Sequence, residues 1–145
     1  MTVEAYVNVV ALMGGARGRD DVRDFDANHF VSHIPPAMET VPLSRTIGQG
    51  RVVDELIRRF THSIRMDWLL PGIAPTGTRV AVPLVAIVQC EGAQVAHKHL
   101  DWDQASVLVQ VGRLLDCTLP VRGGEIAAHV LDPTQPSSGS PAGDS

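Results

Sequence analysis

The ionisable side chains most suited to catalysis lie in one short segment, from His97 to Asp103. Successive side chains of a strand point to opposite faces, so His97, His99 and Asp101 would form one row and Lys98 would face the other way. Two imidazoles beside a carboxylate favour general acid–base catalysis, because the carboxylate orients the imidazole and tunes its pKa toward neutrality. We therefore take His97, His99, Asp101 and Asp103 as the candidate catalytic residues.

The preceding segment, residues 79–90, predicts which way this row points. A two-residue turn at Glu91–Gly92 would place His99 opposite Leu84, on a face of aliphatic side chains. Burying unpaired polar groups there costs about 1–3 kcal/mol, and more for charges, so such a row normally lines a pocket or is satisfied by its neighbours. A three-residue turn would reverse the parity. On the two-residue turn, we predict that Lys98 faces away from Leu84.

Each of these residues also has a structural interpretation. His97 and His99 are equally well explained as core histidines that hydrogen-bond to the backbone or to Asp54. Asp103 stands where a strand gives way to a helix, and it is a better N-cap than acid catalyst. A His-x-His pair can supply two zinc ligands, with His62 or Asp101 as a third, but no spacing here is diagnostic. We expect neither a metal nor a cofactor.

A second set of candidates lies on a long strand predicted over residues 51–68. Its even positions are the more apolar set, and Asp54, Arg58 and His62 fall on that same face. The strand would therefore send ionisable groups toward the interior. Together with Trp68 and Leu84, these three are our candidate substrate-binding residues, although packing is the better explanation of the tryptophan.

The remaining pattern predicts a small α+β domain. A helix, then strands joined by short turns, then a helix packed back on the sheet is typical of an antiparallel meander. After residue 132 the chain is rich in Pro, Ser and Gly, and we expect a disordered tail over residues 133–145. The other expected elements are a strand within 3–13, a helix over 18–34, strands over 40–47, 79–90 and 94–102, a loop over 71–77 and a helix starting near residue 103.

Composition narrows the partners. The net charge is −4, from 12 basic and 16 acidic residues that are spread along the chain, which argues against a nucleic-acid partner. No apolar run approaches the roughly 18–20 residues that cross a bilayer, so we expect no membrane partner. The two cysteines form no CxxC pair, and we expect a cytoplasmic protein with reduced thiols. Eleven of the basic residues are arginine, and Lys98 is the only lysine.

Five segments of the chain are distinctive: residues 52–56, 60–62, 66–73, 75–77 and 97–112. Together they resemble the SnoaL-like branch of the nuclear-transport-factor-two-like superfamily. The resemblance covers residues 5–132, and we assign residues 1–132 to one SnoaL-like domain. It implies a cystatin-like cone: a strongly curved antiparallel sheet wrapped around helices that encloses a mostly apolar cavity, often in a dimer. Characterised members include polyketide cyclases that close rings by aldol chemistry with an acidic residue, and relatives are often labelled carboxymethylenebutenolidase-like.

The chain also departs from the pattern of that family. Relatives usually carry a glutamate where Lys98 stands, and tyrosines where Asp26 and Asp101 stand. The one or two helices that normally open the fold are not seen upstream of Thr2. We expect the cavity to be partly open on that side.

Three functions are compatible with these residues. The first is a small-molecule lyase, isomerase or cyclase, in which a His/Asp group moves a proton next to a carbonyl of a small apolar, aromatic or polyketide-like ligand. The second is a hydrolase of a strained ring, an epoxide or lactone, with paired carboxylates and an arginine such as Arg58 activating water. No G-x-S-x-G motif supports a nucleophile-elbow hydrolase. The third is a non-catalytic binding or dimerisation module. We expect a homodimer, because large exposed apolar patches are rare on monomers.

Overall fold

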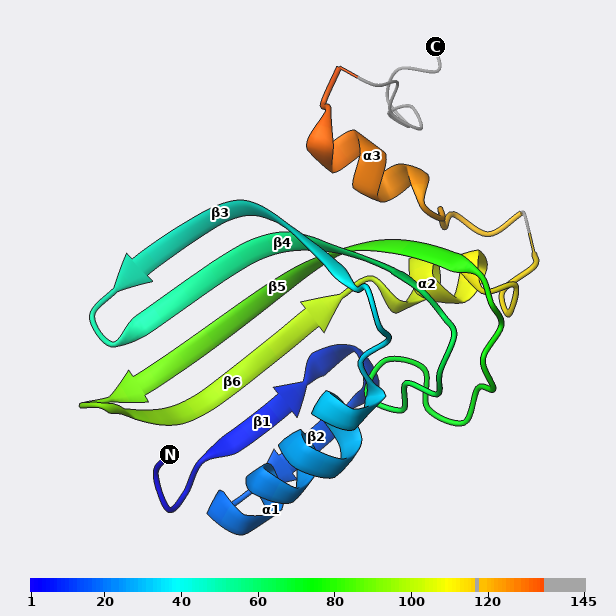
Figure 1. Ribbon diagram of the computed structural model, residues 1–145. Helices are drawn as coiled ribbons and strands as arrows, with labels where there is room; N and C mark the ends of the chain where they lie inside the picture. The colour runs from blue at the N-terminus through cyan, green and yellow to red at the C-terminus, as the bar shows by residue number, and fades with distance from the viewer. Residues whose placement is uncertain (117, 135–145) are drawn as a thin grey trace.

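The protein, described by a computed structural model over residues 1–116 and 118–134, is built on one curved six-stranded sheet (Figure 1). The strand order is β2-β1-β6-β5-β4-β3. Neighbouring strands are antiparallel except β1 and β6, which are parallel. The predicted α+β fold with a curved sheet is therefore confirmed, although the sheet is mixed rather than purely antiparallel. The strands are β1 (Tyr6–Val9), β2 (Gly14–Arg17), β3 (Glu39–Gly48), β4 (Arg51–Thr61), β5 (Arg79–Glu91) and β6 (Gln94–Trp102).

Helices lie on both sides of this sheet. Helix α1 (Arg19–Asp24) continues into a π-helical turn η2 (Phe25–Phe30) and a 3-10 turn η3 (Val31–His33), and it lies below the sheet in Figure 1. Helix α3 (Glu125–Leu131) lies above the sheet, and α2 (Gln104–Gln110) follows β6 directly. A further 3-10 turn, η1 (Val10–Leu12), joins β1 to β2. We call the α1 side the inner face and the α3 side the outer face.

The core sits on the inner face, where the even positions of β4 and β5 carry buried apolar side chains. Leu56 pairs with Leu84 and Phe60 with Val80, and all four are buried. Val22 of α1 packs into the same cluster. The loop between β4 and β5 closes one end of the core with Met66, Trp68, Leu69 and Leu70.

Several element boundaries differ from the prediction. Strand β4 ends at Thr61 rather than continuing to residue 68, because the chain leaves the sheet for the apolar loop that fills the core. The predicted strand within residues 3–13 is short, spans Tyr6–Val9, and is followed by the unpredicted β2. Helix α3 was also not predicted. The predicted tail lies outside the described residues from residue 135 onward.

Helix α2 is held against the sheet by one glutamine. The Gln110 side chain donates to the Ala81 carbonyl and accepts from the Ala81 N–H, both at 2.9 Å. The β6 pairing with β5 reaches only as far as Leu84, so this amide satisfies β5 backbone groups that β6 no longer reaches. Val107 of this helix and Val111, which directly follows it, are both buried.

None of the helices within residues 1–116 and 118–134 is long and apolar enough to span a membrane. Cys90 carries a free thiol, and Cys117 lies outside the described residues.

Candidate functional site

The β5–β6 hairpin turns one residue later than predicted. Gly92 and Ala93 form the turn, Gly92 has a φ of 61°, and Glu91 faces Gln94. Positive φ at this position suits glycine, which lacks a Cβ. Moving the turn by one residue shifts the β6 partner of each β5 residue by two positions. Because side chains alternate between faces with a period of two, this shift alone would have preserved the predicted faces.

A β-bulge at Ala96 reverses those faces. Cys90 pairs with Val95, but Gln89 pairs with His97, so one extra residue enters β6 between these two pairs. Because side chains alternate with a period of two, one inserted residue moves every later side chain to the opposite face.

The predicted orientation of the central row was therefore wrong. Beyond the bulge Lys98 pairs with Val88, Leu100 with Ala86 and Trp102 with Leu84. These three β6 residues share the inner face with the core. His97, His99 and Asp101 face outward instead, so their side chains do not point toward the inner face as predicted.

On the outer face, the two histidines form an aromatic cluster with Tyr6 of the neighbouring strand. The Tyr6 and His97 rings stack with centroids 4.7 Å apart, and His99 meets the His97 ring edge-on at 5.1 Å. Burial of its ring, together with the nearby His99, lowers the pKa of His97. In the part of the chain that the structure describes, no hydrogen bond joins a carboxylate to either imidazole. The predicted His/Asp acid–base group is not assembled here.

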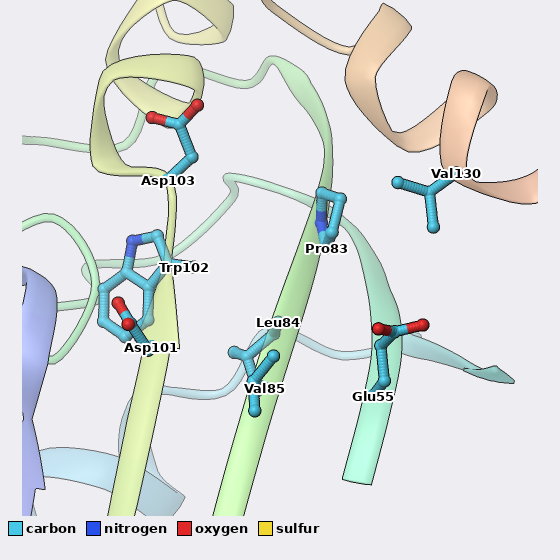
Figure 2. A pocket seen from close by; sticks show the side chains of 8 residues that line it. All are labelled: Glu55, Pro83, Leu84, Val85, Asp101, Trp102, Asp103 and Val130. Carbon is cyan, nitrogen blue, oxygen red and sulfur yellow. The ribbon is translucent and has the colours of Figure 1, made fainter. Parts of the chain in front are cut away.

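The two predicted catalytic aspartates line a separate outer pocket of about 380 Å³ between the sheet and α3 (Figure 2). Figure 2 shows the carboxylates of Asp101 and Glu55 on either side of Val85. Asp103 accepts a hydrogen bond from the Ser106 N–H at 3.2 Å, which confirms its predicted N-cap role. The lining contains no Lys, Arg or His side chain to work with the carboxylates. It consists of Glu55, Pro83, Leu84, Val85, Asp101, Trp102, Asp103 and Val130.

The inner face carries an ion pair between Lys98 and Asp26. Lys98 Nζ lies 3.8 Å from Asp26 Oδ2, and the side chains are 39% and 31% exposed. Both residues line a pocket of about 230 Å³ between η2, α1 and β6, whose other lining residues include Val7 and Val22. Positions 26 and 98 are two of those at which the sequence departs from the SnoaL-like pattern. Neither residue was predicted as a site residue, because nothing in the sequence indicates that residues this far apart meet.

Strand β4 presents Asp54 and Arg58 to the inner face, as predicted. Arg45 binds Asp54 through two hydrogen bonds of 2.7 and 3.0 Å, and this pairing lowers the pKa of Asp54. Arg58 is half-buried, and burial lowers its pKa. The Arg58 guanidinium donates to the Thr40 hydroxyl on the adjacent strand. Asp54 is therefore paired with an arginine, whereas Arg58 has no carboxylate partner within the described region.

The other three candidate binding residues belong to the core. His62 is fully buried, and its Nδ1 lies 2.9 Å from Thr76 Oγ1 and 3.2 Å from the Thr76 N–H that donates to it. Burial and the charge of Arg113 lower the pKa of His62. Trp68 donates its ring N–H to the His33 carbonyl and packs against neighbouring aromatic rings, and Leu84 is buried in the same cluster.

No group of three or more His, Cys, Asp or Glu side chains among residues 1–116 and 118–134 is arranged to hold a metal ion.

No protein-family model matches the chain, and no curated protein matches it in sequence. Solved structures do match. A protein assigned as a SnoaL-like polyketide cyclase from Jannaschia sp. CCS1 superposes with a TM-score of 0.61 at 22% identity, covering 77% of this chain and 72% of that one.

Two further structures share the architecture. A protein from Catenulispora acidiphila DSM 44928 with a ketosteroid isomerase-like fold, in complex with trimethylamine, has a TM-score of 0.57 at 16% identity, covering 77% of this chain and 76% of its own. TerC, co-crystallised with polyporic acid, has a TM-score of 0.52 at 14% identity, covering 77% and 80%. The chain therefore has the same fold as these SnoaL-like and ketosteroid isomerase-like structures.

Proposed function

We propose that the protein binds a small, largely apolar molecule on the inner face of its sheet and transfers a proton next to a carbonyl group of that molecule. The observation that carries this proposal is the Lys98–Asp26 pair beside an inner pocket lined by Val7 and Val22. Structural neighbours that bind small molecules, such as TerC with polyporic acid, support the binding part of the proposal.

The chemistry follows from the two charged groups. The Asp26 carboxylate would take a proton from the carbon next to the carbonyl, and the Lys98 ammonium would donate a hydrogen bond to the oxygen that becomes negative. An enolate conjugated with a C=C bond would then recover the proton from Asp26 at the far carbon, which is an isomerisation. Alternatively, its α-carbon would attack a second carbonyl and close a ring, and the alkoxide that forms would take the proton from Asp26. The proposed reaction belongs to the first class predicted from the sequence, that of a lyase, isomerase or cyclase. Asp26 and Lys98 take the role that was predicted for the His/Asp group.

The strained-ring hydrolase has less support. That mechanism needs paired carboxylates with an arginine, but Asp101 and Asp103 face the outer pocket while Arg58 faces inward. A non-catalytic binding module has one observation in its favour, because Lys98 and Asp26 already neutralise each other without a ligand.

The proposal is tested with 2-tetralone, a bicyclic ketone with exchangeable protons next to its carbonyl. Incubation in D₂O followed by NMR reports proton transfer without knowledge of the natural substrate. We expect wild type to accelerate exchange and Asp26→Asn to abolish the acceleration, since the amide is not a base. Asp21→Asn, an exposed change of the same charge on α1, is the control and should match wild type. If 2-tetralone binds but its proton exchange is not accelerated, the proton-transfer part of the proposal is wrong and the protein is a non-catalytic binding module.

We also propose a homodimer formed through the outer face. Tyr6, His97, His99 and Ile87 are only half-buried there, and aromatic and apolar side chains are typical of interface centres. Light scattering at micromolar concentration tests this, and a stable monomer would contradict it.

A further inference from the structure

The outer face of the sheet orders its side chains in three rows that run across β4, β5 and β6. The basic row, nearest the β5–β6 hairpin, consists of Arg51, Gln89 and His97. The middle row, two residues further along each strand, consists of the half-buried Val53, Ile87 and His99. The acidic row, two residues further again and about 13 Å from the basic row, consists of Glu55, Val85 and Asp101.

The charges of these rows are not paired within the described part of the chain. Arg51 Nε donates to the side-chain oxygen of Gln89 at 2.7 Å, and that acceptor is neutral. Glu55 and Asp101 have no hydrogen bond or ion pair among the described residues, and Figure 2 shows their carboxylates on either side of Val85. Exposed charges need no partner, so the informative feature is their order about the middle row.

This order is self-complementary under a two-fold rotation. In an isologous contact, residue i of one chain meets residue j of the other, and j meets i. A two-fold axis that follows the middle row across the strands exchanges the basic and acidic rows. Arg51 then faces the partner's Glu55, and His97 faces the partner's Asp101. The apolar side chains of the middle row meet their own copies on the axis.

The other way of stacking two copies of this face opposes like charges. If the two-fold axis follows the strands instead, the basic row lies over the partner's basic row and the acidic row over its acidic row. Like charges that face each other across an interface are strongly unfavourable. Charge complementarity therefore selects a second copy that is turned end over end about the middle row.

Helix α3 leaves room for this contact. It stands on the side of the acidic row away from the hairpin, where Val130 and Pro83 line the outer pocket (Figure 2). In the rotated copy it lies at the hairpin end of the first chain, so the three rows remain between the two helices. Sheets packed face to face lie about 10 Å apart, a gap that an arginine and a glutamate side chain bridge together.

We propose that the outer face binds a second copy of this chain, in a two-fold dimer held by reciprocal Arg51–Glu55 and His97–Asp101 contacts. This rests on the homodimer proposed above and names its axis and its contacts. Each contact occurs twice, so a single charge reversal puts two pairs of like charges into the interface.

Two charge reversals test the contacts. Arg51→Glu puts a negative charge opposite the partner's Glu55, and Glu55→Arg puts a positive charge opposite the partner's Arg51. We expect each change to weaken the dimer at least about tenfold in sedimentation equilibrium. The first change makes the net charge of the chain more negative and the second makes it less negative, so net charge cannot explain a loss in both.

Restoring complementarity should restore the dimer. The double variant Arg51→Glu/Glu55→Arg exchanges the two charges, so its dissociation constant should return to within about threefold of the wild-type value. Mixing the two single variants should also give a dimer, because one chain then offers only acidic groups at these two positions and the other only basic groups.

The control variant is Arg59→Glu. Arg59 also points outward from β4, but it lies four residues beyond Glu55, away from the hairpin. The position that the rotation brings over it lies past the end of the partner's β4, so its reversal should leave the dimer unchanged.

The failures of the two proposals are distinguishable. If wild type is a dimer that the single reversals do not weaken, or that Arg59→Glu weakens equally, the homodimer stands and this interface is wrong. The same holds if the double variant and the mixture stay as weak as the single variants. A wild type that is a monomer at micromolar concentration would overturn both. Thermal melts of each variant confirm that the compared proteins are folded.

Discussion

Replacing His62 with alanine should destabilise the protein strongly, because this imidazole lies in the core and anchors the loop between β4 and β5. Its Nδ1 accepts from the Thr76 N–H at 3.2 Å and lies 2.9 Å from the Thr76 hydroxyl. The backbone also fastens this loop at the same residue, since Gly77 N–H donates to the His62 carbonyl. The loop contributes the buried side chains of Met66 and Leu70.

The magnitude follows from two losses. Leaving the Thr76 N–H without its acceptor costs about 1–3 kcal/mol, and removing most of a fully buried side chain adds a cavity term that brings the total to about 3–5 kcal/mol. At about 3 °C per kcal/mol for a domain of this size, the melting midpoint should fall by about 10 °C or more. The measurement is urea and thermal unfolding at pH 7.5, where both the native and the unfolded imidazole are neutral.

His99→Ala is the matched control. His99 is half-buried on the outer face and has no hydrogen bond within the described region, so its loss should cost less than about 1 kcal/mol. If His62→Ala costs no more than His99→Ala, the loop is not held by the imidazole and the reasoning is wrong.

Two further predictions concern pH and the attachment of α2. Burial lowers the pKa of His62 below its ordinary value of 6.5, so below that pH the unfolded chain binds more protons than the native protein. The free energy of unfolding should therefore be level above about pH 6.5 and fall as the pH drops below it. The fall in urea midpoint between pH 7 and pH 5 should be smaller in His62→Ala. An unchanged slope would exclude His62 as its cause. Gln110→Leu leaves the Ala81 N–H and carbonyl without their partner, which should lower the free energy of unfolding in urea by about 2–4 kcal/mol. The control Gln94→Leu, at the exposed hairpin, should lower it by less than about 0.5 kcal/mol. Equal losses would show that Gln110 does not anchor the helix.

Features that depend on neighbouring residues were predictable from the sequence. The alternation of apolar side chains along β4 placed Asp54 and Arg58 on the inner face, and the structure has them there. Asp103 was recognisable as an N-cap because the interaction joins residues only three apart. The segments around residues 52–77 and 97–112 indicated the SnoaL-like fold, which the structural matches confirm.

The composition of the candidate site was decided by tertiary structure. One extra residue at Ala96 reverses the faces of His97, Lys98 and all later residues of β6, and an alanine in a strand carries no local signal of a bulge. The Lys98–Asp26 contact joins residues 72 positions apart, and it exists because β6 is flanked by the parallel β1 and covered by η2. Alternation along a strand says which side chains share a face, but only the packing of the sheet against its helices determines which face encloses the pocket.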